Sequence, residues 1–223
     1  MKDNLPSKPG TMGTDGRLHL DYDWYDRGIP PNIEFGSQAY IDTSYGFAQC
    51  FSEQQPGIVL GAATGAYDRT NFIVGPRGRV VVGGYTILNG TTLVCHDRIE
   101  IGHHCLLAWG SVLTDTWGDL QNVSIEMRRK ILFLAATDPF RLLPPVTAPQ
   151  PVILEDNSWV GFEAVILPGV RLGHGCIVGS KTVIDTDVPP YAVVAGSPPR
   201  IIRYLEPDDT DEMRQRALQE YLR

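Results

Sequence analysis

The chain has 223 residues, of which 43% are hydrophobic and 20% are charged, and its formal net charge is −7. This composition is typical of a globular protein with one substantial core. Because nucleic-acid binding needs a cationic surface and the chain contains no basic run, we expect no nucleic-acid partner. No stretch approaches the roughly 18 apolar residues of a membrane span, so we expect no membrane-spanning segment.

Two further features indicate a reduced, cytoplasmic protein. The N-terminal stretch MKDNLPSKPGTMGTDG is polar and lacks the apolar core of a signal peptide. The chain has no CxxC pair among its four cysteines, which are Cys50, Cys95, Cys105 and Cys176.

The first 55 residues have no regular period and are rich in aromatic residues, as in LDYDWYDRGIPPNIEFGSQAYIDTSYGF. We expect residues 1–55 to form an irregular cap. Such a cap would cover backbone groups that the first strands of the following domain leave unpaired.

A repeat of six residues dominates the second half of the chain. Aliphatic residues recur at every sixth position, and these are Leu154, Val160, Ile166, Leu172, Val178 and Ile184. A mostly small residue precedes each of them by two positions, and these are Val152, Ser158, Ala164, Val170, Cys176 and Thr182. This period is typical of a parallel β-helix, in which six residues form one side and one corner of a three-sided coil. A β-sandwich, the alternative, would alternate every two residues without a period of six.

The same ladder extends upstream in three shorter runs. Their inward residues are predicted to be Leu60, Ala66 and Phe72, then Val82, Leu88 and Val94, then Ile101, Leu107 and Leu113. The spacing of seven between Val94 and Ile101 predicts one bulged residue. We therefore assign a mainly β fold, a parallel β-helix over residues 56–203, whose coils bury their apolar faces only by stacking.

We expect an insertion at residues 115–153 to interrupt the ladder and a tail at residues 204–223 to follow it. The insertion contains VSIEMRRKILFLAAT, which predicts a helix that begins near Asn122 or Ser124. Long loops on compact domains are commonly functional. The tail DDTDEMRQRALQEYLR predicts a short amphipathic helix.

The ladder SWVGFEAVILPGVRLGHGCIVGSKTVI, followed by the exit DVPPYAVVAGSPPRIIR, resembles the hexapeptide-repeat acyltransferases with a left-handed β-helix. Sugar O-acetyltransferases and xenobiotic acetyltransferases belong to that family. The resemblance implies a homotrimer and no metal. It also implies that acetyl-CoA or another acyl-CoA is the co-substrate and lies in a groove between subunits. A hydroxyl or amine of a small acceptor, such as a sugar, would attack its thioester.

The resemblance also implies binding residues by position. Contacts with acyl-CoA would come from Phe162, Ser180, Asp185 and Thr186. On the exit segment, Arg200 and Arg203 would face the nucleotide phosphates, which guanidinium groups bind well. The family often has Lys where this chain has Thr186.

Relatives place a catalytic histidine at the start of the inserted loop, where this chain reads TWGDL and has no histidine between Asp115 and Leu154. His96 follows the predicted rung Val94 by two residues, as Asp115 follows Leu113. The two should therefore share a corner in adjacent coils, about 5 Å apart. We predict a His–Asp dyad in which His96 accepts the acceptor proton and Asp115, or Asp119 from the loop, holds the imidazole.

Two alternatives remain open at the level of sequence. The chain could be an inactive scaffold or ligand-binding homologue that has lost the loop histidine. A metal-dependent hydratase using His96, His103 and His104 resembles the γ-class carbonic anhydrases, although the spacing does not match their ligand pattern.

Overall fold

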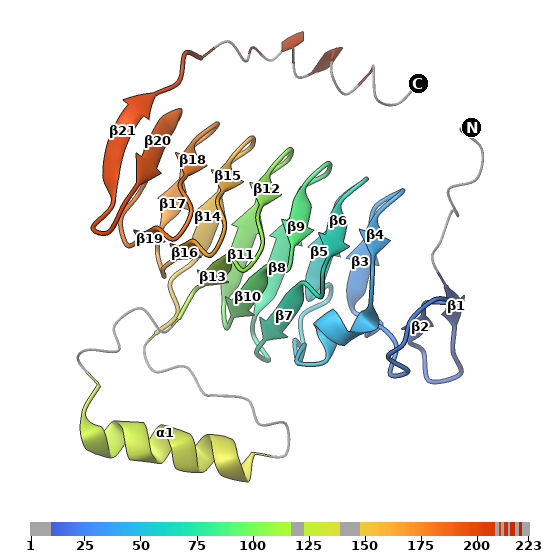
Figure 1. Cartoon of the computed structure of the whole chain (residues 1–223). Coiled ribbons are helices and arrows are strands. Elements are labelled where there is room, and N and C mark those ends of the chain that lie inside the picture. The colour runs from blue at the N-terminus through green and yellow to red at the C-terminus, as the bar shows by residue number, and fades with distance from the viewer. Residues whose placement is uncertain are drawn as a thin grey trace.

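The computed structural model describes residues 10–116, 123–138 and 148–207, together with positions 210, 212, 213, 215, 216 and 219. Short parallel strands wind into a coil with three flat sides (Figure 1). The predicted mainly β fold, a parallel β-helix, is confirmed. None of the described helices is long and apolar enough to cross a membrane.

Each side of the coil is one sheet. Face I contains β3 (Ile33–Phe35), β5 (Ile58–Leu60), β8 (Arg79–Val82), β11 (Arg98–Ile101), β14 (Val152–Leu154) and β17 (Arg171–Leu172). Face II contains β4 (Tyr40–Ile41), β6 (Gly65–Tyr67), β9 (Ile87–Asn89), β12 (Leu106–Leu107), β15 (Trp159–Val160), β18 (Ile177–Val178), β20 (Ala192–Ala195) and β21 (Arg200–Tyr204). Face III contains β7 (Asn71–Val74), β10 (Thr92–Cys95), β13 (Val112–Thr114), β16 (Val165–Ile166) and β19 (Val183–Ile184).

The coil begins earlier than the sequence indicated. A hairpin of β1 (Thr11–Met12) and β2 (Leu18–His19) comes first, and then β3 pairs in parallel with β5. β4 likewise pairs with β6, and the 3₁₀-helix η1 (Ser44–Phe47) follows. Part of the expected cap at residues 1–55 is therefore the first coil, because Ile33 and Ile41 turn inward like later rungs.

The interior confirms most of the ladder. All six rungs from Leu154 to Ile184 are buried, as are the small residues that precede them, including Cys176. Upstream, the inward residue of β10 is Leu93, which is fully buried and pairs with Leu113, whereas Val94 faces outward. The prediction of Val94 as a rung was wrong, because Leu93 and Val94 are both aliphatic and either could face inward.

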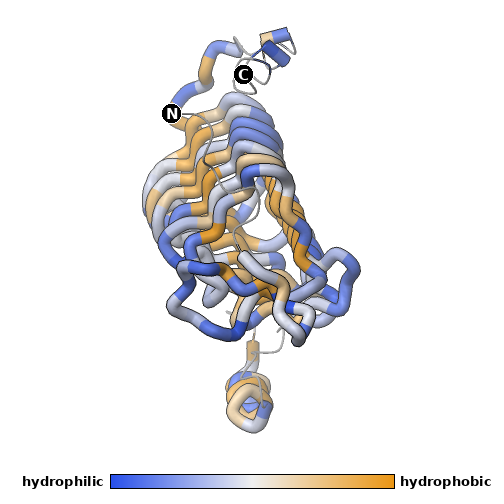
Figure 2. The backbone as a smooth tube through the Cα atoms, turned by 90° about the vertical axis from the view of Figure 1, so that its right-hand side faces the viewer, coloured by the Kyte–Doolittle hydropathy of each residue, from blue (hydrophilic) through white to orange (hydrophobic). Residues whose placement is uncertain are grey.

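Tight corners connect the faces. At the corner between faces I and II one residue per coil adopts a positive φ, and these residues are Gln38, Ala63, Tyr85, His104, Asn157, Gly175 and Tyr191. The left-handed conformation turns the chain within few residues, and stacked corners share backbone hydrogen bonds. Viewed along the stack, the apolar stretches of successive coils lie above one another (Figure 2).

Two segments depart from the coil. Helix α1 (Ile125–Thr137) begins at Ser124, whose side chain accepts from the Met127 N–H, and it stands away from the coil in both views (Figures 1 and 2). The exit forms an antiparallel hairpin of β20 and β21, which the sequence did not predict. In the tail, Glu212, Met213, Gln215, Arg216 and Gln219 are helical.

Candidate active site

At the corner between faces III and I, Gly75, His96 and Asp115 lie in three successive coils. His96 follows β10 and Asp115 follows β13, and these strands are parallel neighbours. Gly75 occupies the coil before His96, since its N–H donates to the Cys95 carbonyl at 2.8 Å. The predicted proximity of His96 and Asp115 is therefore present, and both residues are buried, with 7% and 0% of their surface exposed.

The Asp115 carboxylate binds main chain. Its oxygens accept from the backbone N–H groups of His96 at 2.9 Å, Asp97 at 2.6 Å and Arg98 at 3.0 Å. The predicted hydrogen bond between this carboxylate and the imidazole is absent from the structure. Three consecutive amides at the turn between β10 and β11 need acceptors, and the carboxylate supplies them, mostly through Oδ2.

The imidazole of His96 makes no hydrogen bond with the described residues. It lies over Gly75, where an added Cβ would be 2.7 Å from the ring atom Nδ1. Desolvation lowers the pKa of His96, the Asp115 charge opposes that shift, and the Arg77 charge adds to it. The lowered pKa favours the neutral ring, which has a lone pair that can accept a proton.

Burial acts on Asp115 in the opposite direction. Desolvation raises the pKa of its carboxyl group, and the backbone N–H groups of His96, Asp97 and Arg98 oppose that shift. The Asp115 carboxylate lies close to the imidazole, because it accepts from the His96 backbone N–H, and its negative charge raises the pKa of the ring against the effect of desolvation.

Both ends of the insertion lie at the same corner. The chain leaves after β13, and on its return the Gln150 N–H donates to the Asp115 carbonyl at 2.7 Å. Asp119, the alternative partner for the imidazole, lies outside the described residues. The insertion thus starts and ends beside His96.

The predicted acyl-CoA residues fall in three places. Phe162 and Ser180 are exposed at the corner between faces II and III. Asp185 and Thr186 are exposed at the His96 corner, and Arg200 and Arg203 are exposed on β21 at the edge of face II. Face III separates the first two corners, so one copy of the chain does not bring all six together.

At the corner between faces II and III, Phe162 lies beside a second aromatic residue, Trp109. The rings of Trp109 and Phe162 stack with their centroids 5.6 Å apart. The indole N–H of Trp109 donates to the Asp68 carboxylate, which fixes the ring. Both aromatic side chains remain about half exposed, at 48% and 52%.

The other histidines have structural partners. The His103 Nδ1 accepts from the Gly84 N–H at 3.0 Å, and the His174 ring packs edge-on against Tyr191. No group of three or more potential metal ligands occurs among the residues that the structure describes. Burial also raises the pKa of the Cys105 and Cys176 thiols to about 12 and 11, so both are inert core residues.

The outward side of face II is apolar along nearly its whole length. The residues in register across its strands are Tyr40, Gly65, Ile87, Leu106, Trp159, Ile177 and Val193. The corresponding row on face I is half charged and half apolar, and consists of Glu34, Val59, Val81, Glu100, Ile153 and Arg171. A row of apolar side chains of this length is typical of a surface that another protein covers.

Residues 151–186 match the family model described as bacterial transferase hexapeptide (six repeats). The chain carries the hexapeptide repeat of bacterial transferases. The resemblance seen in the sequence is therefore confirmed, and the fold is the left-handed β-helix of that repeat.

Curated relatives and solved structures agree with this hexapeptide-repeat assignment. A chloramphenicol acetyltransferase of Klebsiella aerogenes is 38% identical over 114 residues, which are 48% of this chain and 51% of the relative. The chain thus spans about half the length of that relative.

Two solved structures share the architecture. A hexapeptide-repeat acetyltransferase of Vibrio cholerae in complex with acetyl-CoA is 25% identical, with a TM-score of 0.52 over 73% of this chain and 76% of that chain. AntD, an N-acyltransferase from Bacillus cereus in complex with dTDP and 3-hydroxybutyryl-CoA, has a TM-score of 0.58 at 17% identity, covering 86% and 89% of the two chains. The second likeness concerns the fold alone.

Proposed function

We propose that this hexapeptide-repeat protein is an acyl-CoA-dependent acetyltransferase that acetylates a hydroxyl or amine of a sugar or another small acceptor. The observation that carries the proposal is the neutral, buried imidazole of His96 at a corner of a repeat that acetyltransferases share. The acetyl-CoA complex of the Vibrio cholerae relative supports the choice of co-substrate.

In the proposed reaction, a nitrogen of the His96 imidazole accepts the proton as the acceptor oxygen or nitrogen attacks the thioester carbonyl. The tetrahedral intermediate then collapses, the carbon–sulfur bond breaks, and the imidazolium returns its proton to the departing CoA thiolate. Asp115 acts as a positioning residue, since its carboxylate holds the His96 backbone. Its negative charge also favours the imidazolium that forms during the reaction.

The site we propose requires a second copy of the chain. Phe162 and Ser180 lie at one corner, whereas His96, Asp185 and Thr186 lie at another, across face III. Packing one subunit against the next would put the first corner of one copy beside the second corner of its neighbour. The apolar row on face II supplies a surface for this contact, and we propose a homotrimer.

The test is release of CoA thiol from acetyl-CoA in the presence of amine and hydroxyl acceptors. Thiol release that depends on both an acceptor and His96 supports the acetyltransferase. The absence of histidine between Asp115 and Leu154 favours one competing function, a ligand-binding homologue without catalysis. That homologue would be stabilised against heat by acetyl-CoA but would release no thiol with any acceptor.

A further inference from the structure

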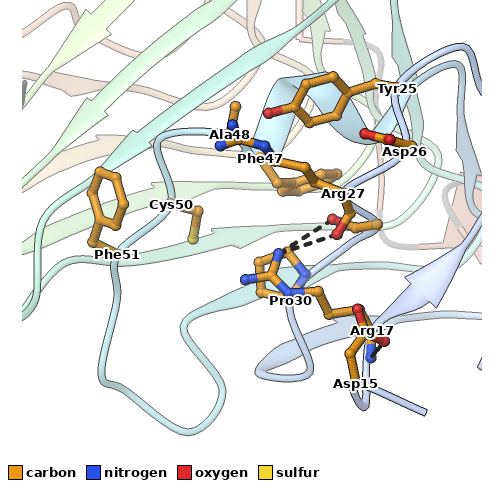
Figure 3. A pocket seen from close by; sticks show the side chains of 11 residues that line it. Asp15, Arg17, Tyr25, Asp26, Arg27, Pro30, Phe47, Ala48, Cys50 and Phe51 are labelled. Carbon is orange, nitrogen blue, oxygen red and sulfur yellow. Dashed lines mark hydrogen bonds between the residues drawn. The ribbon is translucent and has the colours of Figure 1, made fainter. Parts of the chain in front are cut away.

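A pocket lies at the N-terminal end of the coil, outside the residues that the acetyltransferase proposal uses. It has a volume of about 700 Å³ (Figure 3). Three segments without the six-residue repeat form its wall: the β1–β2 hairpin, residues 25–30, and residues 47–51, which begin at the last residue of η1. Pockets of this size suit a small-molecule ligand.

This pocket lies along the same corner as His96. The Phe51 N–H donates to the Val74 carbonyl at 2.8 Å, so residues 50–53 form the coil that precedes Gly75. Gly75 in turn donates to the Cys95 carbonyl, next to His96. Two strand spacings, about 10 Å, therefore separate the backbone of Phe51 from that of His96.

Two guanidinium groups line the pocket without acidic partners. Within the described part of the chain neither Arg17 nor Arg27 forms a salt bridge, and Arg17 reaches only the carbonyls of Arg27 and Gly28, at 3.4 and 3.5 Å (Figure 3). The formal charges of the lining balance, because Asp15 and Asp26 are also present. Asp15, however, is already engaged by His19 at 3.3 Å and by the Arg17 backbone N–H at 3.0 Å.

Aromatic rings complete the wall. Tyr25, Phe47 and Phe51 lie around the two arginines (Figure 3). Phe47 is held rigid by stacking on Phe72, with ring centroids 4.9 Å apart. The Arg27 guanidinium lies over the Tyr25 ring, 5.9 Å from its centroid. Aromatic walls with two guanidinium groups that lack acidic partners among the described residues suit a ring-bearing molecule that carries phosphate, since guanidinium binds phosphate oxygens in a bidentate manner.

We infer that this pocket binds the anionic part of the acceptor, and that the acceptor is a sugar carrying a phosphate or diphosphate. Arg17 and Arg27 bind the phosphate oxygens, and the aromatic residues pack against the ring attached to them. The attacking hydroxyl or amine then extends along the corner toward His96. The inference rests on the proposed acetyltransferase function and names its substrate class.

Calorimetry with three probes tests it directly: glucosamine, glucosamine 6-phosphate and uridine diphosphate. We expect the two phosphate-bearing probes to bind and unphosphorylated glucosamine to bind at least tenfold more weakly. Arg17→Gln and Arg27→Gln should each raise the Kd for the phosphate-bearing probes about tenfold, as expected for a lost charge-assisted contact. Arg171→Gln, which removes an exposed arginine on β17 at the opposite end of the coil, should leave every Kd unchanged. Stronger binding of uridine diphosphate than of glucosamine 6-phosphate would identify a nucleotide-linked sugar.

Separate measurements of probe binding and of thiol release distinguish the proposed anion site from the proposed acetyltransferase activity. Equal affinities for glucosamine and its 6-phosphate, or arginine variants with wild-type affinities and unchanged melting temperatures, would overturn the inference even if thiol release occurs. Binding that follows the pattern above, with no thiol release from acetyl-CoA and any acceptor, would uphold the anion site and reject the acetyltransferase.

Discussion

The Asp115 side chain binds the main chain of His96, since both carboxylate oxygens lie 2.9 Å from the His96 amide nitrogen. The carboxylate thus sets where the histidine backbone lies and leaves the ring nitrogens free. The geometry differs from a catalytic triad, in which the acidic group binds the ring itself. A neutral imidazole without a hydrogen-bonded partner among the described residues is suited to accept a proton from a bound molecule.

Asp115→Asn should destabilise the fold. The neutral amide retains one acceptor but also brings an N–H₂ group toward three backbone N–H donors. We expect a loss of about 1.5–3 kcal/mol in the free energy of unfolding, the value typical of hydrogen bonds to a charged group. Urea denaturation measures it, with Asp185→Asn as the control, because Asp185 is exposed at the same corner. Equal midpoints for Asp115→Asn and wild type would show that the carboxylate does not hold the turn.

Gly75→Ala should displace the His96 ring. The added Cβ would lie 2.7 Å from Nδ1, closer than carbon and nitrogen approach without a shift. We expect about a tenfold loss in kcat with little change in KM for acetyl-CoA, because the base would be misplaced while the thioester site stays intact.

Gly175→Ala is the comparison for the Gly75 variant. Its added Cβ would lie 3.0 Å from Cδ1 of Tyr191, at a residue with positive φ at the corner between faces I and II, so it costs stability without touching His96. A Gly75→Ala enzyme as active as Gly175→Ala would argue against a role for this ring position.

The pH dependence follows from the lowered pKa of His96. The unfolded chain takes up a proton near pH 6.5, whereas the folded protein takes it up only at lower pH. Stability therefore decreases as pH falls from the unfolded toward the folded pKa, and this decrease should be smaller in His96→Gln. The acid limb of kcat/KM should have its midpoint below pH 6.5 for the same reason. An NMR titration of the His96 ring with a midpoint above 6.5 would contradict both expectations.

Phe162→Ala should weaken binding of acetyl-CoA. The exposed ring, stacked on Trp109, offers a flat surface at the corner that we assign to the co-substrate. We expect KM for acetyl-CoA to rise about tenfold, equivalent to about 1.4 kcal/mol, with kcat nearly unchanged. Tyr85→Ala, at the corner between faces I and II, should leave KM as in wild type. Unchanged KM in Phe162→Ala would remove this residue from the proposed site.

Ile177→Glu should dissociate the proposed trimer. The substitution puts a charge into the apolar row of face II, between Trp159 and Val193. The matched change Ile153→Glu affects the outward row of face I, beside Arg171, and should leave the assembly intact. Sedimentation velocity distinguishes the two, and a trimer that survives Ile177→Glu would exclude face II from the interface.

Much of the coil could be predicted because each rung repeats at a fixed position and points into the same core. The rungs from Leu154 to Ile184 and the small residues before them needed only this period. The prediction failed at β10, where two adjacent apolar residues could each have been the inward residue. Leu93 and Val94 differ by one position, and only pairing with Leu113 decides which faces inward.

The candidate site was predicted only in part. Spacing placed His96 and Asp115 at one corner, but it does not determine whether a carboxylate binds a ring or a backbone. Three backbone N–H groups at one turn bind the Asp115 carboxylate and keep it from the ring, and their positions depend on the three-dimensional course of that turn. The pocket of Arg17 and Arg27 was not predicted, because it joins segments without any repeat.

The most direct measurement is acetyl transfer by His96→Gln, in which the glutamine side chain retains polarity but cannot act as a base. If His96 is the base, kcat/KM should fall roughly 10²–10⁴-fold, while the unfolding midpoint and the affinity for acetyl-CoA stay near wild type. A variant that transfers the acetyl group at the wild-type rate would contradict the assignment of His96 as the proton acceptor.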